Sequence, residues 1–155
     1  MASIGGYFDG SIVPALIEAC LADDEPGAIA RSRQGTGTQA YSSVKRAIVI
    51  ATRRRAAAWG ADGVRLNVVV PGNMSTPMLD GVYATPGMGD QTRAMPVPLG
   101  RDGAAAEVAA VAAFLLGEGA SYVHGAAIPV DGGVLAGLQP DPFGDPRPGA
   151  SEGEA

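Results

Sequence analysis

The fold class is decided by residues 64–72, which read VRLNVVVPG. Four of the last five residues before the proline are apolar, and the final three are valines with branched β-carbons. A short apolar run closed by Pro71-Gly72 predicts a strand that is covered on both faces. Such double coverage is typical of a parallel sheet with helices on either side.

A helix is expected before this strand, from Tyr41 to about Gly60. Its apolar face is predicted at Val44, Ile48 and Ala51, which follow the helical repeat. Glycine commonly stands just beyond the last residue of a helix, so Gly60 is expected to end this one. The segment therefore predicts an amphipathic helix packed against the sheet.

A second helix and a second strand are expected after residues 64–72. Asp102 is a candidate N-cap for a helix over 103–116, which ends at glycines and carries an apolar stripe formed by Val108, Val111, Ala112 and Leu115. Residues 126–130 predict a strand, and Pro129 favours a place at the sheet edge because it lacks an N–H group. The order strand–helix–strand predicts a parallel βαβ unit, whose ligands bind beyond the carboxyl ends of the strands.

The remaining segments show weaker patterns. Residues 1–6 read as a strand end that runs into a turn, and residues 11–22 as a short helix. Residues 23–39 read as a loop, with room for one helical turn around Ala28 to Arg31. Residues 73–100 show no long period and contain four methionines. This pattern favours a functional lid with an adaptable binding surface, although a methionine fills a gap in a core equally often. Residues 139–155 have little to bury and predict a disordered tail.

Composition excludes several classes of function. The 155 residues carry a net charge of −5, which argues against a nucleic-acid-binding protein, and the basic run at 53–55 is interpreted as a solvated helix face. One cysteine and one histidine cannot build a disulfide or a His/Cys metal site. Neither a secretory signal nor an apolar stretch long enough to span a membrane is visible. A cytoplasmic, soluble protein is therefore expected.

Tyr41 and Lys45 lie four residues apart at the start of the first helix. This spacing places both side chains on one helical face, and Lys45 is the only lysine beside ten arginines. A lysine provides a compact ammonium that the planar guanidinium of arginine does not replace. The pair predicts a catalytic site, although the same spacing also occurs on ordinary solvated helix faces.

Three motifs in this order resemble the short-chain dehydrogenase/reductase family. They are Tyr41-x-x-x-Lys45, then Val70-Pro71-Gly72-x-x-x-Thr76-Pro77, then Val130-Asp131-Gly132-Gly133. The resemblance covers about residues 40–135 and is strongest to the 3α-hydroxysteroid dehydrogenase/carbonyl reductase group. That subgroup likeness rests on RAAAWG at 55–60, GVRLN at 63–67, ASYVHG at 120–125 and the long insertion at 7–39.

The resemblance implies an α/β fold, the C-terminal portion of a Rossmann-like doubly wound parallel sheet. Residues 1–138 would form a partial dehydrogenase domain with an insertion at 7–39 and a substrate loop at 73–100. It also implies an NAD(P)-dependent oxidoreductase acting on a small carbonyl or alcohol, and a 3α-hydroxysteroid is one candidate substrate. NAD is favoured over NADP, and the full-length protein is expected to form homo-oligomers.

The resemblance also implies the roles of individual residues. Tyr41 would exchange a proton with the substrate oxygen, while Lys45 would favour the phenolate and hold the nicotinamide ribose. Further cofactor contacts are expected along the segment after the strand, from Pro71, Gly72, Met74, Ser75 and Thr76.

Two departures from the family pattern are visible. No Gly-x-x-x-Gly-x-Gly turn follows a strand, so Gly5-Gly6 and residues 35–37 are interpreted as turns, and the N-terminal nucleotide-binding half is expected to be absent. Ser3 aligns best with a serine three positions beyond the catalytic one, and its assignment as the catalytic serine is the second choice.

These departures lead to two hypotheses for the chain. One is a truncated dehydrogenase, or a start assigned too late, that is inactive by itself. The other is a non-enzymatic remnant that acts as an interaction or oligomerisation module.

Overall fold

Two parallel strands form the centre of the fold, β1 (Val68–Pro71) and β4 (Ala127–Val130). The computed structural model describes residues 1–140, and within these residues β1 and β4 make a two-stranded sheet. Val68 lies opposite Ala127 and Pro71 opposite Val130, so both carboxyl ends meet at one edge. The predicted parallel pair is confirmed, and within the described chain Pro129 lies on an edge strand.

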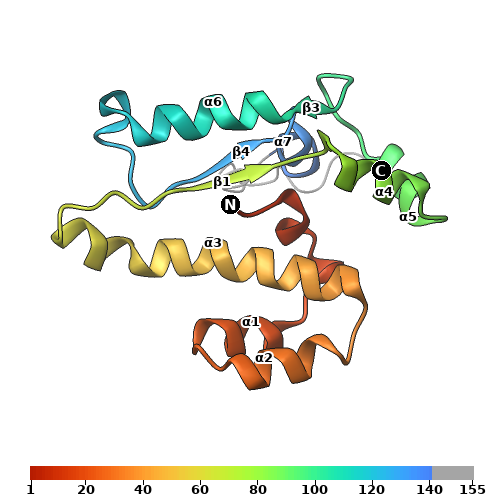
Figure 1. Ribbon diagram of the computed structural model, residues 1–155, viewed down its shortest axis with the longest axis horizontal. Coiled ribbons are helices and arrows are strands. Elements are labelled where there is room, and N and C mark those ends of the chain that lie inside the picture. Colours follow the sequence, from red (N-terminus) through yellow and green to blue (C-terminus); the bar gives the residue numbers. More distant parts are fainter. Residues whose placement is uncertain (141–155) are drawn as a thin grey trace, which may run out of the picture.

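The sheet lies between two helices, α3 (Gly37–Ala61) and α6 (Ala105–Leu116), as Figure 1 shows. The core fills the space between α3 and the sheet. Its buried members come from the N-terminus, β1 and α7 (Val134–Leu138); they are Ala2, Ile4, Val68, Val70, Val134 and Leu135. Val69 is only half-buried, so β1 is more deeply covered on one face than on the other.

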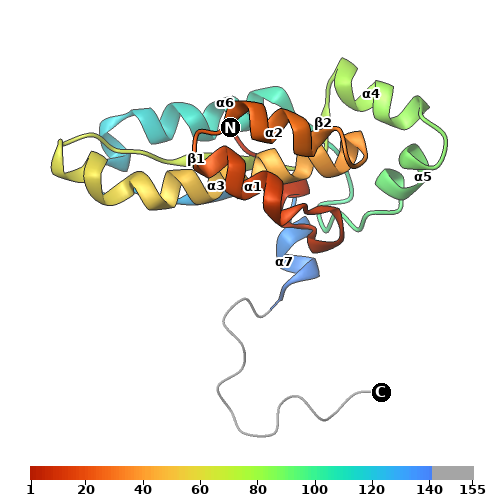
Figure 2. The same ribbon diagram turned by 90° about the horizontal axis from the view of Figure 1, so that it is seen from below.

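A helical pair covers the side of α3 that faces away from the sheet (Figures 1 and 2). It consists of α1 (Pro14–Leu21) and α2 (Glu25–Ser32). Leu16 is nearly fully buried against α3. The Ser43 hydroxyl accepts a hydrogen bond from Val13 N–H at 2.8 Å and donates one to Gln39 O at 2.7 Å, which fastens the start of α1 to α3.

Three expected boundaries are wrong. Helix α3 begins at Gly37 because Thr36 and Gln39 form a reciprocal cap. It continues through Gly60 to Ala61, and Gly63 is the residue with a left-handed φ of +73°. The segment 23–39, expected to be mostly loop, contains the eight-residue α2, whose N-cap is Asp24. The Asp24 carboxylate accepts a hydrogen bond from Gly27 N–H, a signal outweighed in the sequence by Pro26 and Gly27.

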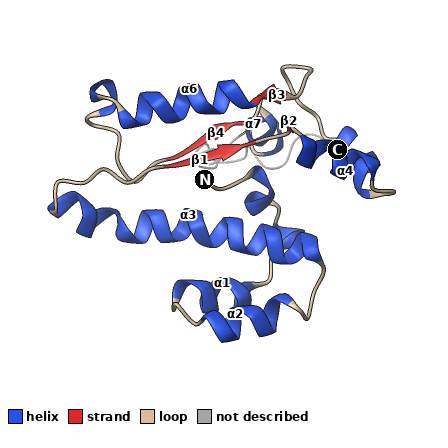
Figure 3. Ribbon diagram, viewed as in Figure 1, coloured by secondary structure: helices blue, strands red, loops and turns tan. Residues whose placement is uncertain are grey.

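The substrate loop at 73–100 was expected to lack regular structure, and this is also wrong (Figure 3). It contains β2 (Met74–Ser75), α4 (Pro77–Ala84) and α5 (Met88–Arg93). β2 pairs in parallel with β3 (Gly103–Ala104), which directly precedes α6. Asp102 is not the N-cap of α6, because its carboxylate accepts from the Tyr83 hydroxyl.

Residues 64–67, the first part of the expected strand, lie outside the ladder, and both backbone and side chains bond this stretch. Leu66 O accepts a hydrogen bond from Gly125 N–H at 2.8 Å. Arg65 donates to Leu115 O at 2.7 Å, at the end of α6. Asn67 donates to Val123 O at 2.7 Å and accepts from Ala126 N–H at 3.0 Å. These bonds set the register of β1 against β4.

Short 3₁₀ helices complete the described chain, η1 (Ile4–Tyr7), η2 (Asp9–Ser11) and η3 (Glu118–Ala120). The N-terminal residues run beside β1, with Ala2 N–H donating to Val69 O at 2.9 Å. The expected disordered tail at 139–155 lies almost entirely outside the described residues.

Candidate active site

Tyr41 and Lys45 lie in the N-terminal half of α3. Figure 1 shows that this half of the helix lies at the end of the molecule where β1 has its carboxyl end. The Lys45 ammonium nitrogen is 5.3 Å from the centre of the Tyr41 ring. The Tyr41 side chain is 45% exposed, so its ring is accessible to a ligand. The expected common face is therefore present, with the cation beside the aromatic ring.

The helix η1 presses two glycines against α3. A Cβ on Gly6 would lie 2.8 Å from Arg46 N, so only glycine fits there without movement of the backbone. Arg46 reinforces the contact, because its guanidinium donates to Gly6 O and to Asp9 Oδ1. Gly5-Gly6 is therefore a close-packing device in a 3₁₀ helix, not the simple turn that the sequence suggested.

Ser3 and Tyr41 both lie close to Gly5. A Cβ on Gly5 would lie 3.4 Å from Tyr41 Cε1, 3.5 Å from Ser42 Oγ and 3.6 Å from Ser3 Oγ. Ser3 is the N-cap of η1, and its hydroxyl accepts from Gly5 N–H at 3.2 Å. The side chains of Ser3, Tyr41 and Ser42, each of which carries a hydroxyl group, thus lie around Gly5. Tyr41 also lies beside Lys45 on α3.

The carboxyl end of β1 brings Pro71 and Gly72 beside the turn after β4. Pro71 is buried, and Gly72 N–H donates to Val130 O at 3.0 Å. A Cβ on Gly72 would lie 2.7 Å from Asp131 Cα, so the close approach that requires glycine here is to the protein's own backbone. The cofactor contact that the sequence analysis expects at Gly72 stays a prediction.

The residues after Gly72 form the bridge into α4. Met74 and Ser75 belong to β2, with Ser75 exposed and Met74 half-buried. The Thr76 hydroxyl caps α4, accepting from Leu79 N–H at 3.4 Å and donating to Met74 O at 3.1 Å. Of these side chains, Ser75 is therefore the one most open to a ligand.

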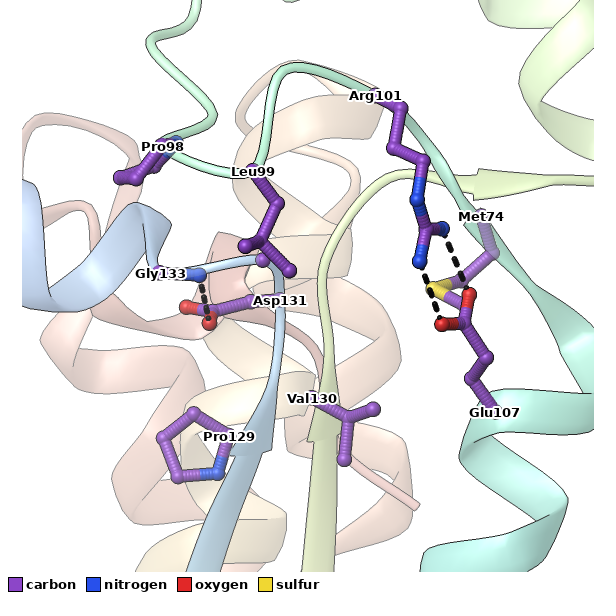
Figure 4. Close-up of a pocket in the computed structure, with 10 residues that line it drawn as sticks. Met74, Pro98, Leu99, Arg101, Glu107, Pro129, Val130, Asp131 and Gly133 are labelled. Atoms are coloured by element: carbon purple, nitrogen blue, oxygen red, sulfur yellow. Dashed lines mark hydrogen bonds and ion pairs between the residues drawn. The ribbon is translucent and has the colours of Figure 1, made fainter.

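A groove of about 420 Å³ lies beside the carboxyl end of β4 (Figure 4). Leu99 and Val130 border it, and Arg101 and Glu107 join across one side. Their bidentate ion pair, at 2.9 and 2.7 Å, lowers the pKa of Glu107 to about 2, with help from the Ala104 N–H. Neither Tyr41 nor Lys45 lines the groove, so it is separate from the convergent hydroxyl groups.

Residues 1–140, which the structure describes, show neither a membrane-spanning helix nor a metal-binding cluster. Residues 1–140 contain no helix that combines the length and apolar character needed to cross a membrane. The same residues bring together no group of three acidic, histidine or cysteine side chains suited to a metal ion.

A family model described as enoyl-(acyl carrier protein) reductase matches residues 27–135. The 3-alpha-hydroxysteroid dehydrogenase/carbonyl reductase of Comamonas testosteroni is 45% identical over 107 residues. The chain belongs to the short-chain dehydrogenase/reductase family. That alignment covers 69% of this chain and 42% of the relative.

Two further relatives of this short-chain dehydrogenase/reductase chain agree. The levodione reductase of Leifsonia aquatica is 37% identical over 109 residues, covering 66% of this chain and 41% of that protein. The crystal structure of the 3-alpha-hydroxysteroid dehydrogenase from Pseudomonas sp. B-0831, complexed with NADH, superimposes with a TM-score of 0.86 at 41% identity. It covers 92% of this chain and 56% of that one. The Rossmann-like α/β fold is thereby confirmed, and the chain spans about two fifths of the curated relatives' length.

Sequence reasoning missed two groups of long-range contacts. His124 lies in a loop and joins α3 to the approach of β1: its Nδ1 accepts from Leu66 N–H at 2.9 Å and its Nε2 lies 2.7 Å from Ala56 O. Tyr83 and Asp102 meet across the supposed loop. No local pattern signals either contact, because the partners are 19 to 68 residues apart.

Proposed function

We propose that this chain carries the catalytic tyrosine and lysine of an NAD(P)-dependent oxidoreductase that interconverts carbonyl and alcohol groups. One observation carries the proposal. Tyr41 and Ser3 lie around Gly5, and the Lys45 ammonium lies 5.3 Å from the centre of the Tyr41 ring. The N-terminal half of α3, which carries Tyr41 and Lys45, lies at the end of the molecule where β1 has its carboxyl end. Ligands of parallel sheets bind at that end.

Tyr41 is proposed as the residue that exchanges a proton with the substrate oxygen. Its exposed ring gives a substrate access, and the ammonium of Lys45 lies beside that ring, where a cation attracts negative charge that develops during the reaction. Ser3 is proposed as a second hydrogen-bond donor to the same oxygen. It can serve only if its hydroxyl proton points away from the Gly5 N–H that it accepts from.

Lys45 and the strip of residues 71–76 are proposed to hold the nicotinamide end of the cofactor. The fit rests on the chemistry of these groups: an ammonium without a described acidic partner suits ribose hydroxyls, and the exposed Ser75 and the backbone after β1 suit a carboxamide. The bound nicotinamide would supply the hydride-transfer chemistry. NAD is the favoured form, since the neighbour of TM-score 0.86 is a complex with NADH.

The substrate is proposed to be a small carbonyl or alcohol compound, with a 3α-hydroxysteroid as one candidate. Support comes from the names of two relatives, a hydroxysteroid dehydrogenase/carbonyl reductase and a levodione reductase. The α4–α5 segment, residues 77–93, is proposed to cover that substrate. A cytoplasmic location is part of the proposal, supported by a single free cysteine.

The decisive experiment uses the protein isolated from its native cells, with its intact mass measured first. The mass shows how much chain accompanies these 155 residues. NADH- and NADPH-dependent reduction is then followed with a panel of ketones that includes a 3-ketosteroid. Tyr41→Phe should lower kcat/KM by about 10²–10⁴-fold, the usual contribution of a positioned acid–base group. Equal activity of wild type and Tyr41→Phe would reject the proposal.

An oligomerisation module is the second candidate, and one surface favours it. Phe114, Leu116 and Tyr122 are 53%, 84% and 102% exposed around the end of α6, where a partner would cover them. Sedimentation at several concentrations tests this candidate with the 155-residue chain. Association that Leu116→Lys abolishes, without any binding of NADH, would favour the module over the enzyme.

A further inference from the structure

Tyr83 joins the far end of α4 to the segment that enters β3. Its hydroxyl donates to the Asp102 carboxylate, with the two oxygens 2.9 and 2.8 Å away. A hydrogen bond to a charged acceptor is stronger than one between neutral groups. Burial, followed by the bond to Asp102, raises the pKa of Tyr83, so the hydroxyl keeps its proton and remains a donor.

Two residues of helix α5, Arg93 and Gly89, also contact this tyrosine. The Arg93 guanidinium lies 4.7 Å from the centre of the Tyr83 ring and donates to Tyr83 O at 3.0 Å. Gly89 is buried directly on the Tyr83 backbone, where a Cβ would lie 3.0 Å from the carbonyl carbon. Glycine at 89 therefore allows α5 to approach α4 closely enough for Arg93 to reach Tyr83.

The α4–α5 segment has little else to hold it. Its two helices pack on each other and on β2, and they protrude at one end of the molecule in both views (Figures 1 and 2). Only Leu79 and Gly89 are buried in these helices, and Met78 is 73% exposed. A segment with few buried contacts opens at low free-energy cost, so a single strong bond has a large influence on it.

A hollow of about 370 Å³ adjoins this cluster, and Tyr83, Arg93 and Asp102 form part of its wall. Asn73, which follows the proposed nicotinamide strip, lines it too. Movement of Tyr83 away from Asp102 would open this wall. Tyr83 and Asp102 thus line the same hollow as Asn73, which follows the end of β1.

We propose that Tyr83 and Asp102 form a latch that holds the α4–α5 segment in its closed position. Tyr83 is then a positioning residue, which acts through the lid and not on the reacting atoms. The significance of the latch for substrate binding rests on the proposed function. The latch itself is a property of residues 77–102 and exists without cofactor or substrate.

Amide hydrogen exchange of the 155-residue chain without ligands tests the latch. Tyr83→Phe should speed exchange over residues 77–93 by about tenfold or more, the scale expected when one charge-assisted hydrogen bond is lost, while α3 stays unchanged. Tryptic cleavage after Arg93 should accelerate in parallel. Tyr122→Phe is the matched control, because it removes the hydroxyl of a fully exposed tyrosine.

A second variant separates the latch from general loss of stability. Asp102→Ala should reproduce the effect of Tyr83→Phe, and the double variant should be no more open than either single one, because both remove the same bond. Unchanged exchange over 77–93 would overturn the proposal, and so would faster exchange throughout the chain or additive effects.

The functional consequence has its own readout in the natively isolated protein. Tyr83→Phe should raise KM several-fold with a smaller change in kcat. The reason is that the α4–α5 segment closes less firmly over the substrate, while the reacting groups stay in place. An unchanged KM beside faster exchange would overturn the lid role. Absence of turnover in the wild type would count against the proposed function, while the exchange result decides the latch.

Discussion

The ammonium of Lys45 lies 5.3 Å from the centre of the Tyr41 ring, one turn further along α3. The Tyr41 ring lies near η1, whose glycines let the N-terminal segment approach this turn of the helix. A cation at this position acts on whatever charge develops on the phenol oxygen. The effect of Lys45 therefore depends on the positive charge of its side chain and on the compact shape of the ammonium group.

Lys45→Met should therefore lower kcat/KM of the natively isolated protein by about 10²-fold or more, since it removes a positioned charge from the site. Lys45→Arg should keep only a small part of the kcat/KM that Lys45→Met loses, because the planar guanidinium does not occupy the place of a compact ammonium. Steady-state kinetics with NADH and a ketone measure both. Arg54→Met, on the exposed side of the same helix, is the control and should leave the rate unchanged. Full activity of Lys45→Met would contradict the assigned role.

The ion pair of Arg101 and Glu107 predicts sensitivity to acid. The pKa of Glu107 is lowered from 4.5 to about 2, chiefly by the hydrogen bond from Arg101. A carboxylate with a depressed pKa stabilises the fold above its unfolded pKa, and this contribution is lost as the pH falls from about 4.5 towards 2. Chemical denaturation at pH 6 and at pH 3 measures the free energy of unfolding. Between these two pH values, Glu107→Gln should lose less of this free energy than the wild type. An equal loss in both proteins would show that the pair does not contribute.

Gly72 predicts a steric effect at the end of β1. A Cβ there would lie 2.7 Å from Asp131 Cα, and backbone atoms cannot move away as a flexible side chain can. Gly72→Ala should destabilise the protein by about 1–3 kcal/mol, measured by urea unfolding. The matched control is Gly81→Ala on α4, where nothing lies within 4 Å of the new methyl group. That substitution should stabilise by up to about 1 kcal/mol, because alanine favours a helix. Equal effects of both substitutions would refute the steric explanation.

His124 predicts a structural role despite its partial exposure. It receives the Leu66 N–H on Nδ1 and therefore carries its proton on Nε2, which lies 2.7 Å from Ala56 O. His124→Ala should cost about 1–2 kcal/mol of unfolding free energy, the usual scale for two lost hydrogen bonds. Ser121→Ala, in the same exposed turn, should be nearly neutral. A neutral result for His124→Ala would show that water replaces both bonds.

Much of the fold could be predicted from periodicity and from a few strong signals. The valine run of β1, the apolar stripe of α6 and the turn after β4 are local patterns, and the parallel pairing of β1 with β4 follows from the helix between them. The expected boundaries failed where a local signal was misleading. Pro26 and Gly27 suggested a loop, but proline is accepted in the first turn of a helix and Asp24 caps it.

The sequence by itself determined the family, the parallel strand pair and the placement of Tyr41 and Lys45 on one helical face, because each depends on spacing within a few residues. Only the tertiary structure decided which side chains meet across long separations. Ser3 approaches Tyr41 around Gly5, His124 bridges Leu66 and Ala56, and Tyr83 reaches Asp102. These contacts depend on how the layers pack, and packing is set by the whole core, so no local pattern in the chain encodes them.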